Sequence, residues 1–176
     1  IQKGTISEPS DEVAQQHFQV LKNTLESKGF VHYELSNFGK EGFFSVNNSN
    51  YWKGKKYLGI GPSAHSFNGH ERSWNVSNNQ LYMKGIQQNQ LPSEKEILTL
   101  TDLYNESVMT GLRTMWGISL PQMEIQLGKK YSDYLRKQSE KFIEQGLLIL
   151  QDEVLKTTPK GLFLTDGISS DLFMIN

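Results

Sequence analysis

The sequence contains no cysteine, and this absence removes several kinds of chemistry. A chain without thiols forms no disulfide, carries no cysteine nucleophile, and supplies no thiolate ligand to zinc or to an iron-sulfur cluster. It also lacks an apolar run near the roughly 18–20 residues of a membrane-spanning helix, and it has no signal peptide with a basic start and an apolar middle. We therefore expect a cytoplasmic protein with no integral membrane segment.

An excess of charge is also missing, because the formal net charge is −1. Nothing in the overall composition therefore indicates nucleic acid or an anionic membrane as a partner. The length of 176 residues is enough to bury a core, as one domain or as two small ones. The chain opens on Ile1 and not on Met, and we expect it to be part of a longer protein.

The first part of the chain reads as one unit of an α/β layer. Residues 10–28 predict an amphipathic helix, because Ser10 and two acids form a helix start and Lys28-Gly29 supplies the stop. The aromatic and β-branched run over residues 30–35 predicts a strand. A loop that leaves such a strand, here residues 36–42, is a common ligand-binding position, and Glu34 at the strand end is a candidate polar contact.

Residues 47–67 combine glycine, proline and aromatic side chains at high density, so we predict the functional site there. We expect an irregular loop, then a short strand over residues 57–60. Strands over 64–67 and 70–74 then flank Asn68-Gly69, a pair typical of a type I′ hairpin turn because both residues tolerate a positive φ.

The remainder predicts a linker and a second domain. Residues 77–90 indicate a short surface helix at a domain boundary, and Ser93-Glu94-Lys95-Glu96 resembles a capping box that would start a long helix ending near Arg113. Three helices followed by a β-hairpin is the order of a winged-helix domain. The later elements expected are a helix over residues 120–127 that Ser119 caps and Gly128 ends, and a third helix that carries Tyr134 to Ile143 and stops at Gly146. Strands over 147–151 and 154–158 and a last helix from about Pro159 follow.

Winged helices often bind DNA, so that function has to be weighed. Between Ser93 and Asn176 the chain carries twelve acidic and only nine basic side chains. Duplex binding requires a dominant basic face that displaces counterions from the phosphates. We therefore expect a packing or lid domain and no nucleic-acid partner.

Several motifs, taken in order, resemble the C-terminal half of the HemW group of radical SAM proteins, which are similar to oxygen-independent coproporphyrinogen III oxidase (HemN). The motifs span nearly the whole chain. They are Tyr33-Glu34-Leu35-Ser36-Asn37-Phe38, Asn48-Ser49-Asn50-Tyr51-Trp52, Tyr57-Leu58-Gly59-Ile60-Gly61-Pro62-Ser63-Ala64-His65-Ser66 and Gly111-Leu112-Arg113.

The resemblance implies the end of a partial TIM-like barrel followed by a mainly helical, winged-helix-like domain, which makes the fold class α/β plus α+β. On this basis residues 1–75 are the last barrel unit with its site loop and hairpin, 76–92 are the connecting helix or linker, and 93–176 are the C-terminal domain. The full-length protein would hold S-adenosylmethionine and a [4Fe-4S] cluster. The family's CxxxCxxC motif is not in this sequence, so this chain alone should bind neither group and be inactive.

The family's haem-related motif is His-Asn-x-x-Tyr-Trp, and here Asn47 stands in the histidine position. An amide is a poor axial ligand for iron, whereas an imidazole ligates it readily. The resemblance assigns haem binding to Asn47, Asn48, Tyr51 and Trp52, with the two aromatic rings stacking on the porphyrin and Asn48 holding the loop or a propionate. The alternative is that Tyr51 and Trp52 only cover the barrel mouth.

The resemblance also assigns the approach to S-adenosylmethionine to Gly59, Gly61, Ser63, Ala64 and His65. Glycine lets the backbone come close to a ligand, although a tight turn into the hairpin accounts for the same pattern. His65 is open to three interpretations, as a cofactor contact, a substitute haem ligand or a histidine satisfied in a turn.

The other three histidines are assigned no site. His17 and His32 are expected to be structural, and His70 to be solvated.

Two functions remain open. The first is a haem chaperone that binds haem and passes it to haem-accepting proteins. The second is the oxidase, which decarboxylates coproporphyrinogen III to protoporphyrinogen IX. The wording of the motifs resembles the HemW side more closely, so we favour the chaperone and leave open whether the family member is an enzyme. The partners implied are haem or a porphyrinogen, haem acceptors and the protein's own N-terminal barrel half.

Overall fold

The computed structural model describes residues 9–175. The chain divides into two compact units, Ile1–Ser45 and Val46–Asn176. The division into residues 1–75, 76–92 and 93–176 stays a prediction. Among the described residues, no helix combines the length and the apolar character needed to cross a membrane.

The first unit contains a helix and a small hairpin. Helix α1 (Asp11–Ser27) begins at Ser10, whose hydroxyl accepts the backbone N–H of Val13 at 3.4 Å. Strand β1 (Val31–Glu34) follows, so the predicted helix and strand are both confirmed. The segment after β1 was expected to be a loop, but residues Asn37–Gly39 form β2, which pairs antiparallel with β1.

Aromatic contacts hold this hairpin together. The imidazole of His32 stacks on Phe38 with ring centroids 4.4 Å apart, and the ring of Phe18 meets its edge at 5.7 Å. The Nε2 atom of His32 lies 3.0 Å from the carbonyl oxygen of Leu35. His32 is therefore a structural histidine, as predicted. Glu34 is buried and accepts a hydrogen bond from the side-chain amide of Asn37.

The second unit opens with α2 (Val46–Trp52), where the sequence predicted an irregular loop. The prediction was wrong because the segment contains neither glycine nor proline and can complete two helical turns. Gly54 ends the helix with φ +60°, and the backbone N–H of Lys55 donates to the carbonyl oxygen of Asn50 at 3.0 Å. This is a Schellman termination, so Gly54 was a stop signal that the sequence did contain.

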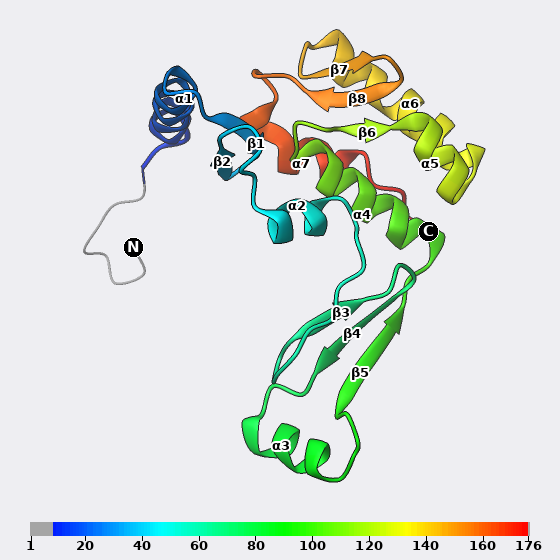
Figure 1. The fold of residues 1–176 in the computed structure, drawn as a ribbon. Helices are drawn as coiled ribbons and strands as arrows, with labels where there is room; N and C mark the ends of the chain where they lie inside the picture. The colour runs from blue at the N-terminus through cyan, green and yellow to red at the C-terminus, as the bar shows by residue number, and fades with distance from the viewer. Residues whose placement is uncertain (1–8, 176) are drawn as a thin grey trace. The chain divides into compact units, whose positions relative to one another are not determined.

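A three-stranded antiparallel sheet follows, in the order β3-β4-β5. It consists of β3 (His65–Phe67), β4 (Glu71–Asn75) and β5 (Ser93–Ile97), and Figure 1 shows α3 (Asn79–Gln87) at the turn that joins β4 to β5. The helix predicted to start at Ser93 is therefore wrong over its first turns. Register pairs from Asn75↔Ser93 to Glu71↔Ile97 give this segment a full ladder of strand hydrogen bonds, which outweigh its local helix signal.

The hairpin between β3 and β4 is confirmed, but its turn differs from the predicted type I′. Only Gly69 of the pair has a positive φ, at +103°. The side chain of Asn68 instead accepts the backbone N–H groups of His70 and Glu71, at 3.0 and 2.8 Å. Gly69 and His70 thus form the two-residue loop. The strand predicted over residues 57–60 reduces to one bridge, Tyr57 with Phe67, because Leu58 and Ile60 remain exposed.

The last part has the order of a winged-helix domain, as predicted. Its elements are α4 (Leu100–Leu112), the short strand β6 (Ile118–Ser119), α5 (Leu120–Leu127), α6 (Lys129–Glu144) and the hairpin β7 (Leu148–Gln151) with β8 (Val154–Thr157). Strand β6 joins the hairpin in the sheet order β6-β8-β7. A single 3₁₀ turn, Leu162–Leu164, precedes α7 (Thr165–Asp171), so the last helix starts later than the predicted Pro159.

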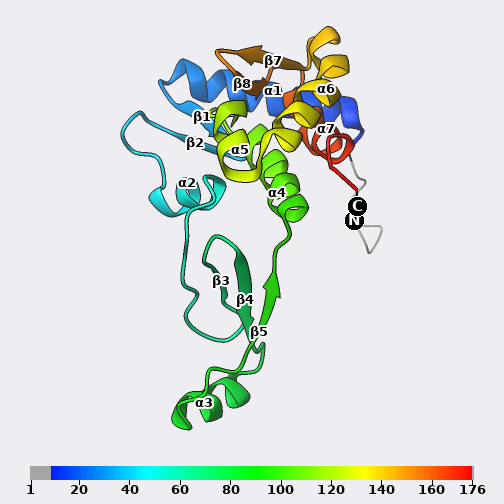
Figure 2. The ribbon, with the colours of Figure 1, turned by 90° about the vertical axis from the view of Figure 1, so that its right-hand side faces the viewer.

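This domain carries a contiguous apolar core. Figure 2 shows that the helices α4, α5, α6 and α7 lie together. The buried side chains of this core come from every α-helix and β-strand from α4 to α7 and from residues directly beside them. They are Tyr104, Val108, Leu112, Ile118, Leu120, Met123, Tyr131, Leu135, Phe142, Leu147, Leu148, Leu155, Ile168 and Leu172.

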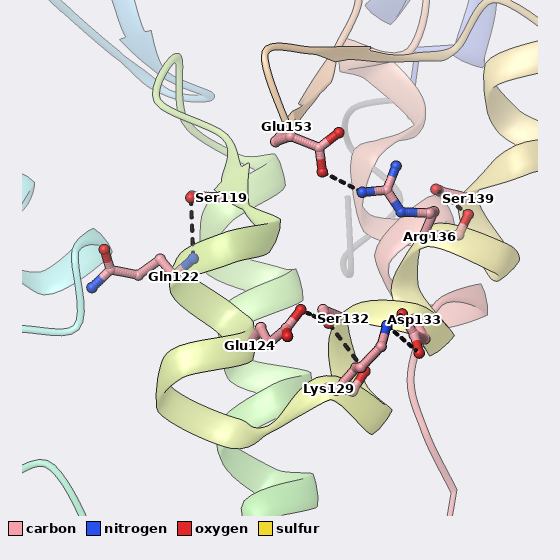
Figure 3. Close-up of polar contacts among 9 residues, drawn as sticks. All are labelled: Ser119, Gln122, Glu124, Lys129, Ser132, Asp133, Arg136, Ser139 and Glu153. Atoms are coloured by element: carbon pink, nitrogen blue, oxygen red, sulfur yellow. Dashed lines mark hydrogen bonds and ion pairs between the residues drawn. The ribbon is translucent and has the colours of Figure 1, made fainter.

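Polar contacts tie the elements of this domain together at its surface (Figure 3). Ser119 caps α5 by accepting the backbone N–H of Gln122 at 3.3 Å, as the sequence predicted. Lys129 donates to Asp133 at 2.7 Å along α6, and Arg136 forms an ion pair with Glu153 in the β7–β8 turn. The cations of α6 drawn in Figure 3 therefore face carboxylates of the same domain.

Candidate functional site

The predicted haem motif lies on α2. Asn47 and Tyr51 are four residues apart, as are Asn48 and Trp52, so the four side chains occupy neighbouring positions on one side of the helix. Asn47 and Tyr51 are exposed, whereas Asn48 and Trp52 are half-buried. The hydroxyl of Ser49 is buried and has no hydrogen-bond partner among the described residues.

A row of aromatic rings runs from α2 to the hairpin. Tyr51 and Trp52 meet edge to face at 5.4 Å, Tyr51 lies 6.0 Å from Tyr57, and Tyr57 lies 6.1 Å from Phe67. The bridge between Tyr57 and Phe67 holds two of these rings side by side. Burial raises the pKa of Tyr57, and the neighbouring Tyr51 adds to the effect, so this phenol stays protonated at neutral pH. The row therefore offers neutral aromatic surface.

Two cations lie over tryptophan rings next to this row. The guanidinium carbon of Arg113 is 5.5 Å from the ring centroid of Trp52, and the Nζ of Lys53 is 4.0 Å from that of Trp116. Arg113 also forms an ion pair with Asp166. Cation–π contacts of this kind hold positive charge beside an apolar surface.

The motif Gly111-Leu112-Arg113 supports this arrangement from the end of α4. A Cβ at Gly111 would lie 2.4 Å from the side chain of Ile118, so glycine is what lets β6 pack against the helix. Leu112 is buried in the core, and Arg113 reaches Trp52. Each of the three residues thus has a structural role.

The aromatic row forms one wall of a cleft of about 500 Å³. Tyr51, Trp52 and Lys53 of α2 line it together with Tyr57 and Phe67. The opposite wall comes from α4 and α5, and the residues lining it there include Leu103, Glu106, Met109, Thr110, Gln122, Met123 and Gln126. A cleft of this size, lined by aromatic and aliphatic side chains together with polar and charged groups, lies within the range of small-molecule sites.

An ion pair joins Arg72 of β4 to Glu106 of α4, and both residues line the cleft. Burial acts to lower the pKa of Arg72, but the attraction and hydrogen bond of Glu106 outweigh burial and raise that pKa. No local pattern in the sequence indicates this pair, because its members are 34 residues apart.

The predicted cofactor loop lies at a different cavity, of about 470 Å³, lined by Ser63, His65, Trp74 and neighbours from β4 and β5. The structure therefore separates the predicted haem residues Tyr51 and Trp52 from the predicted cofactor residues Ser63 and His65. Asn47, Asn48, Gly59, Gly61 and Ala64 line neither cavity.

Two side chains that the sequence did not indicate hold the cofactor loop. Asn75 is buried and donates from Nδ2 to the carbonyl oxygen of Gly61 at 2.8 Å, and the hydroxyl of Tyr82 accepts the N–H of Gly61 at 3.2 Å. A Cβ at Gly59 would lie 2.1 Å from the backbone oxygen of His65, so the close approach at Gly59 is chain against chain. Gly61, with φ +106°, has no atom near its Cβ position and leaves open space.

The remaining histidines differ in their surroundings. His17 is exposed on α1, and His70 is exposed, as expected, in the Gly69–His70 loop, where it also lines the cleft. The ring of His65 lies 6.2 Å from Trp74. No group of three or more His, Asp or Glu side chains in residues 9–175 is arranged to hold a metal ion.

Comparison with known proteins gives three findings. Residues 98–164 match the family model of the HemN C-terminal domain. The heme chaperone HemW of Bacillus subtilis is 27% identical over 169 residues, which cover 96% of this chain and 45% of the relative. The radical S-adenosyl methionine domain-containing protein 1, mitochondrial, of Bos taurus is 31% identical over 180 residues, which cover 96% of this chain and 41% of the relative. The chain is HemW/HemN-like and contains the HemN C-terminal domain.

A solved structure shares this HemW/HemN-like fold. The coproporphyrinogen III oxidase (HemN) of Escherichia coli, described as a radical SAM enzyme, superposes with a TM-score of 0.69 at 18% identity, covering 94% of this chain and 42% of that chain. At this identity the likeness shows the fold alone. The chain spans less than half the length of the relatives it matches.

The matched family domain and the lining of the cleft both include α4. The matched HemN C-terminal domain starts at Leu98, just before α4, and includes the α4 and α5 wall of the cleft. The aromatic wall comes from residues that precede it. The cleft of this HemW/HemN-like chain thus joins the C-terminal domain to the segment that carries the predicted haem motif.

Proposed function

We propose that this chain is the haem-handling part of a longer radical SAM protein that acts as a HemW-like haem chaperone in the cytoplasm. The observation that carries the proposal is the cleft of about 500 Å³. Its lining includes the aromatic residues Tyr51, Trp52, Tyr57 and Phe67 and the cations Lys53 and Arg72. The names of the relatives, which include heme chaperone HemW, support the same function.

The chemistry of the lining fits a metalloporphyrin. A porphyrin presents two flat apolar faces, which stack favourably on aromatic rings, and two propionates, which pair with arginine and lysine. The aromatic row lines the cleft together with Lys53 and Arg72, and Arg113, which is not part of the lining, lies over the ring of Trp52. In this proposal Asn47 and Asn48 also contribute to haem binding, although neither residue lines the cleft. Asn47 is exposed on α2 and Asn48 is half-buried.

The same proposal includes S-adenosylmethionine and a [4Fe-4S] cluster in the full-length protein. The chain has no cysteine, so thiolate ligands for a cluster would come from outside it. The open space beside Gly61 and the exposed Ser63 and His65 fit a loop that approaches a ligand, with Gly59 and Ala64 shaping its backbone. When bound, such a cluster supplies one-electron chemistry.

We also propose that residues 1–75 complete a barrel whose other half is the protein's own N-terminal part, with 76–92 as connection and 93–176 as C-terminal domain. Large apolar side chains on the segment 57–97 support a covered surface there, because exposed apolar patches mark interaction sites. Leu58, Ile60 and Ile97 are 77%, 85% and 80% exposed. Haem-accepting proteins would be the further partners.

The oxidase is the second candidate, favoured by the fold shared with coproporphyrinogen III oxidase. An anaerobic assay of the natural protein, with its cluster reconstituted and S-adenosylmethionine added, separates the two. We expect stoichiometric haem binding and no conversion of coproporphyrinogen III. Formation of protoporphyrinogen IX at enzymatic rates would contradict the chaperone.

A further inference from the structure

Haem iron in the cleft needs a ligand that the motif on α2 does not supply. Asn47 stands in the position where the resemblance expects histidine, and it does not line the cleft. Its amide would in any case be a poor ligand for iron. The assignment of an iron ligand rests on the proposed function. The candidate ligands are the other side chains that line the same cavity.

Only one imidazole among the described residues lines this cleft, that of His70. His65 lines the other cavity, the ring of His32 is stacked between Phe18 and Phe38, and His17 lies on α1 in the other unit. Imidazole is the commonest protein ligand of haem iron. His70 is therefore the nitrogen donor that shares a cavity with the aromatic row.

The backbone of His70 is fixed although its side chain is exposed. Its N–H donates to the side-chain oxygen of Asn68 at 3.0 Å, and its carbonyl oxygen accepts the N–H of Leu98 at 3.0 Å. These two bonds anchor the loop to β5 and to its own turn. Within the part of the chain that the structure describes, the imidazole has no hydrogen-bond partner, so both ring nitrogens are available.

The neighbours of His70 have the chemistry that a haem ligand requires. Phe67, at the turn end of β3, and Tyr57, which bridges to it, supply apolar surface, and Arg72, two residues after His70, supplies a cation in the same cleft. Two thioethers also line the cleft, those of Met109 and Met123. Met123 is 4% exposed and packs in the domain core, whereas Met109 is 39% exposed and is the competing soft ligand.

We propose that His70 ligates the iron of haem bound in the cleft, in place of the histidine missing at position 47. The hairpin that carries β3 and β4 thereby becomes part of the haem site and not only a structural extension. His70 of the Gly69–His70 loop lines the same cleft as the aromatic row, and the ion pair of Arg72 with Glu106 holds β4 against α4.

The test is a haemin titration of the natural protein followed by optical absorption, with variants His70→Ala, His70→Gly, Met109→Leu and His17→Ala. We expect His70→Ala to shift the Soret band and to weaken binding at least tenfold. Imidazole added to His70→Gly should restore the original spectrum, which a purely structural role of His70 would not allow. The matched control His17→Ala removes an exposed histidine outside the cleft and should leave spectrum and affinity unchanged. Because His70 is exposed in a loop, its variants should fold, and far-ultraviolet circular dichroism checks this.

The outcomes separate the ligand from the proposed function. Saturable haem binding with an unchanged spectrum in His70→Ala overturns the assignment of His70 alone. A shift in Met109→Leu with none in His70→Ala overturns it in favour of the thioether. Absence of saturable binding by the unaltered protein overturns the proposed function, and the ligand with it.

Discussion

At the scale of single residues, Tyr104 shows how a polar group is kept inside the C-terminal domain. Its side chain is fully buried between α4 and α7, and its hydroxyl donates to the carbonyl oxygen of Leu172 at 2.9 Å. Burial raises the pKa of this phenol well above its usual value, with a smaller contribution from Tyr134. The folded state therefore holds Tyr104 in its neutral form.

Tyr104→Phe should lower the free energy of unfolding at neutral pH by about 1–2 kcal/mol, because the hydrogen bond to Leu172 is lost. The raised pKa makes the stabilisation by neutral Tyr104 complete below the unfolded-state pKa of about 10, and the stabilisation is lost as the pH rises above that value toward the folded-state pKa. Urea unfolding at neutral and alkaline pH measures both effects. An alkaline loss of stability as steep in Tyr104→Phe as in the unaltered chain would contradict the assignment.

Some residues of the cleft could be predicted from a local sequence motif, and others could not. Tyr51 and Trp52 were predicted because their motif is local, and the structure places both in the cleft. Arg72, Glu106 and His70 were assigned no site, because they become neighbours only when the hairpin packs against α4. Residue type and spacing cannot reveal such long-range pairs.

At the scale of elements, the start of α4 shows where local patterns compete. Two capping boxes are present in the sequence, Ser93 with Glu96 and Thr99 with Asp102. In the structure Thr99 accepts the backbone N–H of Asp102 at 3.2 Å, and Asp102 accepts that of Thr99 at 2.8 Å, whereas Ser93 lies in β5. Pairing with β4, which local sequence does not encode, decides between the two.

Asp102→Asn should therefore destabilise the domain by up to about 1 kcal/mol, because it removes a carboxylate from the first turn of α4 and weakens the charge-assisted hydrogen bonds from Thr99. The matched control Glu96→Gln alters the unused box and should leave stability within about 0.5 kcal/mol, as surface changes usually do. The hydrogen bonds from Thr99 lower the pKa of Asp102, so the stabilisation is complete above the unfolded-state pKa of about 4 and is lost as the pH falls through the lower, folded-state pKa. Chemical unfolding of both variants gives the comparison, and equal losses would contradict it.

Most of the remaining elements were predictable because short sequence motifs mark where they begin and end. Ser10, Ser119 and Gly128 mark helix ends that the structure confirms. Asp152 and Glu153 both have a positive φ in the β7–β8 turn, where the sequence placed a two-residue turn. The helix α2 was missed because its seven residues carry weak helix formers, and its stop signal Gly54 was read as part of a loop.

At the scale of the whole molecule, the winged-helix order raises the question of nucleic acid. Helix α6 holds the position of a recognition helix, and three of its cations pair with carboxylates: Lys129 with Asp133, Arg136 with Glu153, and Lys141 with Asp171. The basic groups available for phosphates are correspondingly reduced.

We expect no mobility shift of duplex DNA by the chain at physiological ionic strength. The reason is the acidic excess of residues 93–176 together with the paired cations of α6. A shift that weakens steeply as salt is added would contradict this expectation, because a salt-dependent affinity is the signature of phosphate contacts.

The cleft itself could not be predicted, although two aromatic residues of one wall, Tyr51 and Trp52, could. Its walls come from α2, the β3–β4 hairpin, α4 and α5, which are spread from residue 51 to residue 127. The predicted haem and cofactor residues were adjacent in sequence and lie at two cavities in the structure. The first of these cavities is the one in which we propose that haem binds.

The most direct measurement is a haem titration of the natural protein against Trp52→Ala, with Trp52→Phe and His17→Ala as controls. Loss of the indole face removes an aromatic stack of about 1–1.5 kcal/mol, so we expect Trp52→Ala to bind about tenfold more weakly. Trp52→Phe keeps an aromatic face and should lose less, and His17→Ala should bind like the unaltered protein. Equal affinities of Trp52→Ala and His17→Ala would contradict the placement of the haem site in this cleft.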